Sequence, residues 1–287
     1  MAAKRRWRSV VDTSAMTGIA DLTGTPIARS AVFDRVIVGV DGSEAGYEAC
    51  RQAKVLAPRD APIEVVSVVH LADAVRTGLS APRVADQLQR EAEATLNRAA
   101  EILGDRARTR FVNGLATDAL LREVERVDAT ALAIGTHGHR RATEIMIGGV
   151  AGELLHRAPC SVLLARAPTD ATAFPGALVV GIDGSPASEA ALAAAQDLAL
   201  RFGARLRIVV ASRGKNVDLD RVSLRAPLAE RVDEHPVKAL VEASRSADLV
   251  VVGSRGLHGL RALGSVSERV AHQAACSVLV TRVAPEA

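Results

Sequence analysis

Aromatic residues are scarce in this chain of 287 residues, where phenylalanine, tyrosine and tryptophan together make up 2%. Proteins that bind single-stranded nucleic acids stack the bases on aromatic side chains, so this composition argues against that class. The net charge is also small, at +3 from 36 basic and 33 acidic residues. Because a dedicated nucleic-acid binder needs a clear excess of positive charge, we expect no nucleic-acid partner.

Cysteine is rare as well, with Cys50, Cys160 and Cys276 as its three occurrences. An odd number of cysteines without C-x-x-C spacing argues against a disulfide framework and against a zinc site. We therefore predict three buried thiols that pack as small hydrophobic side chains.

Long hydrophobic runs are absent, and none reaches the roughly 18 residues that a membrane-spanning helix needs. Residues 1–10 are basic, but no hydrophobic segment of the kind found in secretory signals follows them. We therefore expect a cytoplasmic protein without a membrane partner.

An internal repeat is the clearest feature that is present. The motif V-G-[VI]-D-G-S occurs within 33–43 and again within 177–185. The sequences APCSVLLAR at 158–166 and AACSVLVTR at 274–282 also match each other. Since the motifs follow in the same order, the chain is a duplication, and its length suits two domains of about 140 residues.

Short hydrophobic runs rich in β-branched residues alternate with helical patterns in each repeat. Residues 36–40, 63–69, 131–135 and 161–165 are such runs, typical of strands buried on both faces of a parallel sheet. Residues 83–103 have helical periodicity with a charged face. The alternation predicts an α/β fold of two doubly wound, Rossmann-like parallel sheets of five strands each.

The domain boundaries follow from the repeat. Ser43 and Ser185 stand where a helix N-cap belongs, and Pro186 suits a first helical position. Asp183 follows Asp41 by 142 positions, whereas the later matching pair Gly135 and Gly253 is 118 positions apart. The second repeat is therefore shorter than the first. The missing residues correspond mainly to the 83–103 helix. The predicted parts are a flexible tail at 1–31, a first domain at 32–167, a linker at 168–175 and a shortened second domain at 176–287.

Glycine-rich stretches follow the fourth predicted strand of each repeat. They read G-x2-G-x9-G-G from Gly135 and G-x2-G-x7-G-S from Gly253. Ligands of open parallel sheets bind beyond the carboxyl ends of the strands, where glycine and a helix N-terminus can receive a phosphate. Turns and helix caps also need glycine, and the turn after Asp41 needs no ligand to form. The two histidines of the sequence THGH at 136–139 lack acidic or cysteine partners, so we expect no metal site there.

The order of these motifs resembles that of tandem universal stress proteins over about residues 33–283. The ATP-binding members of that family carry G-x2-G-x9-G-[S/T]. The resemblance implies a ribose near Asp41, an adenine against Val68 and phosphates along the glycine-rich loop. The implied nucleotide-binding residues of the first half are Asp41, Val68, Gly135, His137, Gly138, Gly148, Gly149 and Val150. Those of the second half are Asp183, Ala211, Gly253, Arg255, Gly256, Gly264, Ser265, Val266 and Ser267.

Each half departs from the family motif in its own way. Gly149 replaces the serine or threonine of the motif, which removes a hydroxyl donor and keeps the backbone amide. The second half keeps Ser265 but shortens the loop by two residues. Because misplacing several amides costs more than losing one hydroxyl, we predict that the first half is the stronger site.

The resemblance predicts a regulator of the stress response that binds ATP, with any Mg²⁺ carried by the nucleotide. We find no nucleophile–base pair and no Walker A lysine, so no catalytic residue is assigned. The alternatives are a nucleotide-free dimerisation or scaffold protein and a slow ATP hydrolase. In the family the last strands pair across the domain interface, which implies an intrachain pseudo-dimer through 161–165 and 277–281. A homodimer of the whole chain is a further expectation from this resemblance.

Overall fold

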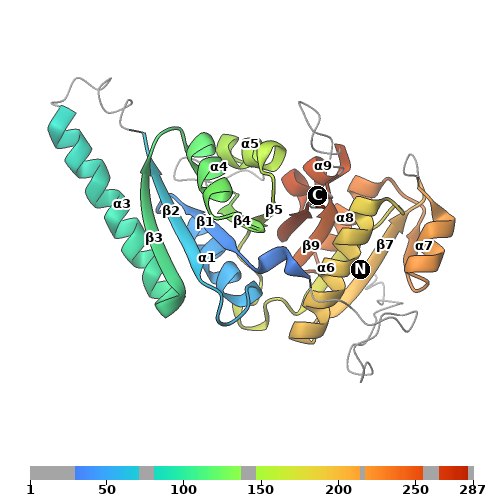
Figure 1. Ribbon diagram of the computed structural model, residues 1–287. Coiled ribbons are helices and arrows are strands. Elements are labelled where there is room, and N and C mark those ends of the chain that lie inside the picture. The colour runs from blue at the N-terminus through green and yellow to red at the C-terminus, as the bar shows by residue number, and fades with distance from the viewer. Residues whose placement is uncertain (1–29, 71–80, 137–146, 214–216, 255–264, 284–287) are drawn as a thin grey trace, which may run out of the picture.

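The computed structural model describes residues 30–70, 81–136, 147–213, 217–254 and 265–283 (Figure 1). Strands and helices alternate through both halves, as the hydrophobic runs predict. The elements of the first half are η2 (Ala31–Phe33), β1 (Val36–Val40), α1 (Glu44–Leu56), β2 (Ile63–Val69), α3 (Ala81–Leu103), η3 (Gly104–Arg106), β3 (Ala107–Asn113), α4 (Ala116–Arg126), β4 (Ala131–Gly135), α5 (Gly149–Arg157) and β5 (Ser161–Ala165). Those that follow are η4 (Ala171–Ala173), β6 (Ala177–Gly181), α6 (Pro186–Phe202), β7 (Arg205–Ala211), α7 (Leu219–Arg225), β8 (Glu230–Val232), α8 (Pro236–Ser244), β9 (Leu249–Gly253), α9 (Ser265–Gln273) and β10 (Ser277–Thr281).

A single sheet of ten strands runs through both halves, in the order β3-β2-β1-β4-β5-β10-β9-β6-β7-β8. Each half contributes five parallel strands, and β5 joins β10 in the one antiparallel pairing of the described strands, for example between Leu163 and Leu279. The expectation of two separate five-stranded sheets is therefore corrected, while the predicted pairing of 161–165 with 277–281 is present. Every residue of both strands is buried, so either strand left at an edge would expose a hydrophobic ribbon.

Helices cover both faces of this sheet and enclose two hydrophobic cores. One core packs residues of α1, α3, α6 and α7 against the sheet, including Leu56 and Leu198. The other packs residues of α4, α5, α8 and α9, including Leu154 and Leu240. Both cores continue across the β5–β10 seam, so the two halves share their hydrophobic interior.

The turns after β1 and β6 confirm the predicted helix starts. Ser43 and Ser185 are the N-caps of α1 and α6, and their side chains accept hydrogen bonds from backbone amides three residues later. Gly42 and Gly184 precede them with φ angles of 83° and 82°, which glycine adopts without strain. The two turns therefore have the same geometry in both repeats.

The second half is shortened between β7 and β8, as the spacing of the repeats predicts. Its crossover helix α7 has 7 residues and β8 has 3, against 23 for α3 and 7 for β3. Figure 1 shows α3 and α7 at opposite ends of the sheet. The crossover is thus reduced to a short helix and remains present.

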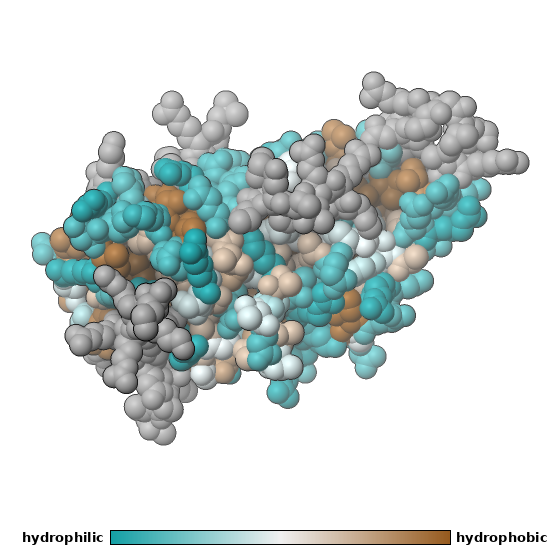
Figure 2. Space-filling view, turned by 180° about the vertical axis from the view of Figure 1, so that it is seen from behind, coloured by the Kyte–Doolittle hydropathy of each residue, from teal (hydrophilic) through white to brown (hydrophobic). Residues whose placement is uncertain are grey.

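The burial of the cysteines and the polarity of the surface agree with what the composition predicts. Cys50, Cys160 and Cys276 are free and buried, as predicted. The face seen in Figure 2 is mainly hydrophilic, with separate hydrophobic patches. In the described part of the chain, no helix is both long and apolar enough to cross a bilayer. The predicted tail lies almost wholly outside the described residues.

Candidate functional site

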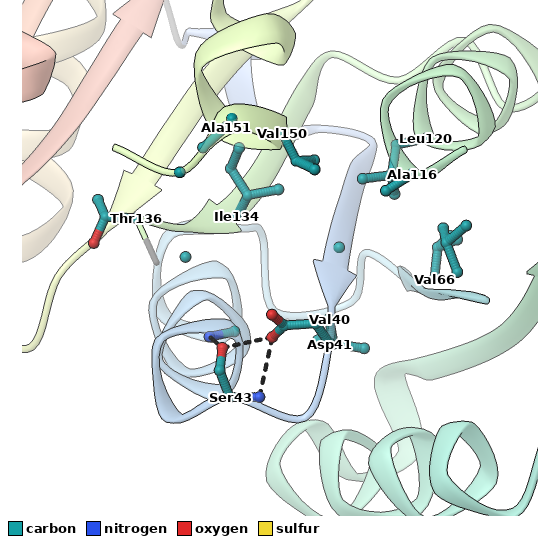
Figure 3. Close-up of a pocket in the computed structure, with 16 residues that line it drawn as sticks. Val40, Asp41, Ser43, Val66, Ala116, Leu120, Ile134, Thr136, Val150 and Ala151 are labelled. Carbon is teal, nitrogen blue, oxygen red and sulfur yellow. Dashed lines mark hydrogen bonds between the residues drawn. The ribbon is translucent and has the colours of Figure 1, made fainter. Parts of the chain in front are cut away.

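A cavity of about 240 Å³ opens at the carboxyl ends of β1 and β4, where the strand order of the first half reverses (Figure 3). This is the place where open parallel sheets bind ligands. Residues of β1, β2, β4, α4 and the start of α5 line it. The sequence-predicted Asp41, Val68, Gly135, Gly149 and Val150 lie together in its wall, as does Gly148.

A carboxylate held by its own turn forms the polar end of the cavity. Asp41 Oδ1 accepts hydrogen bonds from Ser43 N, at 3.0 Å, and from Ser43 Oγ. Gly46 N in turn donates to Ser43 Oγ at 3.2 Å, which closes the N-cap of α1. Within the described residues Asp41 Oδ2 has no hydrogen-bond partner, and the residue is exposed. The turn is therefore a complete helix cap that still offers one carboxylate oxygen to a ligand.

Aliphatic side chains form the opposite wall. Val66 and Leu120 are buried, and Val68 is half-buried at the end of β2. Figure 3 shows Leu120, Ala116 and Val66 on the side of the cavity opposite Thr136. A wall of this kind suits a flat, weakly polar group such as a nucleobase.

The N-terminus of α5 faces the cavity with little side-chain cover. Gly148 is its N-cap, provides no side-chain cap, and donates its amide to Thr136 O at 2.9 Å. The amides of the first helical turn have no partner within a helix, and the helix dipole adds positive potential there. Among the described residues, a Cβ atom built on Gly149 would meet nothing within 4 Å, and one on Gly148 would meet only Thr136 O at 3.7 Å. Packing against the described residues therefore requires neither glycine, and both leave room there in front of these amides.

Gly135 and Gly253 also have a packing role that their motif does not reveal. A Cβ atom on Gly135 would lie 2.6 Å from the carbonyl carbon of Ala45, and one on Gly253 would lie 2.2 Å from Ala187 O. Each glycine therefore allows the first turn of α1 or α6 to lie against the end of a strand. Packing alone accounts for these two glycines, although Gly135 also lines the cavity.

The second half repeats much of this geometry. In the sheet, Gly39 of β1 pairs with Val66 of β2, and Gly181 of β6 pairs with Val209 of β7. Val68 and Ala211 each lie two residues further along, so they are equivalent positions. Asp183 Oδ1 accepts hydrogen bonds from Ser185 N at 3.0 Å and from Ser185 Oγ at 2.6 Å. In α9, Val266 is half-buried and Ser267 is buried.

In the second half, the start of α7 lies close to the turn that follows β6. Asp218 N donates to Asp183 O at 2.9 Å, and a Cβ atom on Gly184 would lie 2.8 Å from Asp218 O. Among the described residues the first cavity is lined by α4 and α5 and not by α3.

Several predicted residues lie outside the described part of the chain. These are His137, Gly138, Arg255, Gly256 and Gly264, and the side chain of Ser265. Sequence reasoning missed Ser43, Val66, Ala116, Leu120, Ile134 and Thr136, which also line the cavity. The strand period of two could have found Val66 from Val68, whereas the α4 residues become neighbours of the site only in the folded chain. Within the described residues no group of three or more His, Cys, Asp or Glu is placed to hold a metal ion.

Known proteins resemble this chain in sequence and in fold. The profile of the Universal stress protein family matches residues 33–166 and 225–282. Universal stress protein Rv2005c of Mycobacterium tuberculosis is 32% identical, over 86% of this chain and 96% of its own length. A Mycolicibacterium smegmatis relative named as a universal stress protein is 30% identical, over 89% and 99%.

A solved structure shows the same arrangement of both halves. The crystal structure of a universal stress protein from Archaeoglobus fulgidus covers 87% of this chain and 96% of its own, with a TM-score of 0.68 and 22% identity. This similarity supports the fold, and the sequence matches extend over both repeats. The chain therefore belongs to the universal stress protein family and carries two copies of its domain in tandem.

Proposed function

We propose that this protein binds an adenine nucleotide, ATP, in the cavity of its first half and acts as a nucleotide-dependent regulator of the stress response. The main support for this proposal is the set of groups that line the first-half cavity. Among the described residues, it combines an aliphatic wall, a carboxylate with one oxygen left without a hydrogen bond and a helix N-terminus without a side-chain cap. These three features match the base, the sugar hydroxyls and the phosphates of a nucleotide.

Each part of the nucleotide has a place in this proposal. The adenine would lie between Val68 and Leu120, where burial of its faces stabilises binding. Asp41 Oδ2 would accept a hydrogen bond from a ribose hydroxyl. The phosphates would lie against the first-turn amides of α5, where a helix N-terminus favours an anion. Any Mg²⁺ would come with the nucleotide.

The arrangement favours binding over catalysis. Asp41 is the one ionisable side chain among the described residues that line the cavity, and its Oδ1 already accepts two hydrogen bonds from Ser43. A hydrolase needs a group that orients or deprotonates the attacking water. A purely scaffolding role would depend on the β5–β10 seam. It would not account for the first-turn amides of α5, to which the N-cap Gly148 provides no side-chain hydrogen bond. We therefore propose a binding protein that acts in the cytoplasm; a homodimer of the whole chain stays a prediction.

Calorimetric titration with ATP tests the proposal with a matched pair of variants. Gly148→Val places a side chain in the cavity, at backbone angles of −62° and 156° that valine adopts readily. Gly152→Val makes the same change on the same helix, at a position where an added Cβ meets nothing within 4 Å and which does not line the cavity. We expect at least about tenfold weaker binding in the first variant, and near-native binding in the second. Equal affinities for all three proteins, or no binding by the native chain, would refute the proposed site.

A further inference from the structure

The last strand of each half ends in an arginine that reaches into the other half. Arg166 follows β5, and its Nη2 and Nη1 donate to Ala271 O at 2.6 Å and Cys276 O at 3.1 Å. Arg282 follows β10, and its Nη2 donates to Leu155 O at 2.7 Å and to His156 O at 3.3 Å. Each guanidinium therefore lies at the carboxyl end of the short helix, α9 or α5, of the opposite half.

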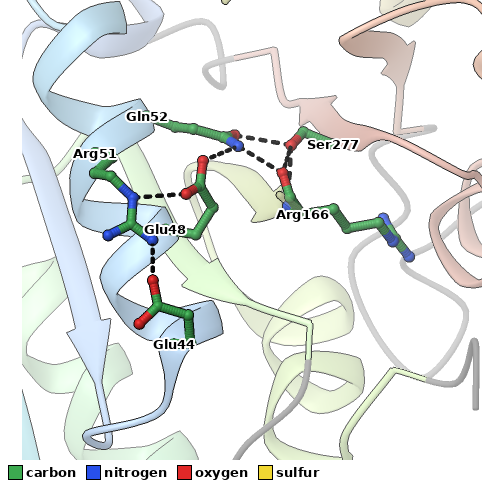
Figure 4. A network of polar contacts seen from close by, with 6 residues as sticks. All are labelled: Glu44, Glu48, Arg51, Gln52, Arg166 and Ser277. Carbon is green, nitrogen blue, oxygen red and sulfur yellow. Dashed lines mark hydrogen bonds and ion pairs between the residues drawn. The ribbon is translucent and has the colours of Figure 1, made fainter. Parts of the chain in front are cut away.

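The seam fixes the backbone of both arginines in the same way. Arg166 N donates to Ser277 Oγ at 3.0 Å, and Arg282 N donates to Ser161 Oγ at 3.1 Å. On the Arg166 side the contact is extended, because Ser277 Oγ donates to Gln52 Oε1 at 2.8 Å and Gln52 Nε2 donates to Arg166 O at 2.8 Å (Figure 4). The two arginines are thus anchored before their side chains reach the partner helix.

Backbone carbonyls at the helix ends are the main partners of these two half-buried charges. Within the described residues, neither guanidinium forms an ion pair with a carboxylate, and both donate to backbone oxygens of the opposite half. The carboxyl end of a helix carries a partial negative charge and unpaired carbonyl groups, both of which a cation stabilises. The guanidinium of Arg282 therefore completes the last turn of α5.

The other end of α5 faces the cavity. The helix has nine residues, which corresponds to about 13 Å from end to end. Ala151, Leu154 and Leu155 are buried and pack its inner face against the core over most of its length. A contact that sets the position of its carboxyl end also sets where its first-turn amides point.

We propose that Arg282, contributed by the second half, is a positioning residue for the nucleotide site of the first half. Arg166 has the same relation to α9, and among the described residues its guanidinium forms no hydrogen bond with α5. This inference rests on the proposed nucleotide binding for its consequence, although the arginine contacts do not depend on it. Without Arg282, Leu155 O and His156 O lose their donor, the last turn of α5 loosens and the amides at the cavity lose their alignment.

Hydrogen exchange with increasing ATP tests this inference, since peptides that cover 149–157 and 265–273 report on the two halves separately. Arg282→Met and Arg166→Met are matched variants, because both remove a half-buried guanidinium from equivalent places in the seam. We expect Arg282→Met to weaken ATP-dependent protection at 149–157 at least about tenfold, and Arg166→Met to change it less than about twofold. Arg282→Lys, which keeps a charged donor, should recover part of the loss.

The same samples without ATP separate this inference from the proposed function. Amides 152–157 should exchange faster in Arg282→Met, while those of α9 stay as in the native protein, and Arg166→Met should show the reverse. A native protein that gains no protection from ATP would count against the nucleotide proposal alone, and the ATP-free pattern would still decide the role of Arg282. Equal effects of both variants on α5, or no effect of Arg282→Met on it, would overturn the inference.

Discussion

At the residue scale, the glycines of the two loop motifs divide into two groups. Gly135 and Gly253 are required by the close approach of a helix to a strand end, whatever the ligand. Gly148 has backbone angles that any residue adopts, and a Cβ atom on Gly149 would meet no described residue within 4 Å. These two glycines therefore affect access to the α5 amides. The same motif therefore contains glycines that packing requires and glycines that we propose for binding. Substitutions at the two kinds of position can distinguish them.

Gly135→Ala should destabilise the fold. The added methyl group would lie 2.6 Å from the backbone of Ala45, so α1 or β4 must shift, and we expect a loss of about 2–3 kcal/mol. Gly152→Ala is the control, because its methyl group meets nothing within 4 Å and alanine favours a helix by about 1 kcal/mol. Urea denaturation measures both. A Gly135→Ala protein as stable as the native chain would contradict the packing role.

Gly149→Ser should strengthen ATP binding. The substitution restores the hydroxyl that the family motif carries, and the added Cβ meets no atom within 4 Å. One additional hydrogen bond to a phosphate corresponds to about 1 kcal/mol, or roughly fivefold in affinity. Titration calorimetry at fixed salt measures the change. Weaker binding by this variant would show that the phosphates do not lie in front of α5.

The buried thiols predict a specific dependence of stability on pH. Burial raises the pKa of Cys50 from 9.0 to about 12 in the folded chain. Above pH 9 the unfolded chain therefore loses a proton that the folded chain keeps, so stability falls as the pH rises from 9 towards 12. The free energy of unfolding should fall by about 1 kcal/mol more in the native protein than in Cys50→Ala between pH 8 and pH 10. Parallel pH profiles for the two proteins would contradict this prediction.

At the scale of elements, local patterns predicted most of the fold. The V-G-[VI]-D-G-S motif correctly marked two strand ends and two helix caps, because Ser43 and Ser185 act through contacts within four residues. The walls of the cavity were harder to predict, since Leu120 reaches β1 and β2 only after α4 has packed on the sheet. The packing requirement at Gly135 was not predicted for the same reason, because its close neighbour Ala45 is 90 positions away.

At the scale of the whole molecule, the seam between β5 and β10 makes one body of two repeats. Both hydrophobic cores cross it, as does the Gln52–Ser277 hydrogen bond. Arg166 and Arg282 also cross it, since each donates to backbone carbonyls of the other half. Arg201 of α6 adds a further contact, since its Nη2 donates to Leu56 O at the end of α1 at 2.9 Å. The halves are therefore expected to depend on each other for stability.

Expressing the two repeats as separate chains, divided within 168–175, tests this dependence. Each repeat alone would expose one strand whose residues are all buried in the whole chain, so we expect self-association or precipitation. Co-expression should yield a complex that contains one copy of each repeat. Light scattering coupled to gel filtration measures the masses. Two stable monomers that do not associate would contradict the shared core.

The central claim is that the first-half cavity holds a nucleotide with its phosphates at α5. A crystal structure of the chain grown with ATP tests it most directly. The account predicts phosphate density against the amides of Gly149 and Val150, the base between Val68 and Leu120, and weaker or no density in the second half. Nucleotide bound only beside Asp183 and α9, or no nucleotide at saturating ATP, would contradict it.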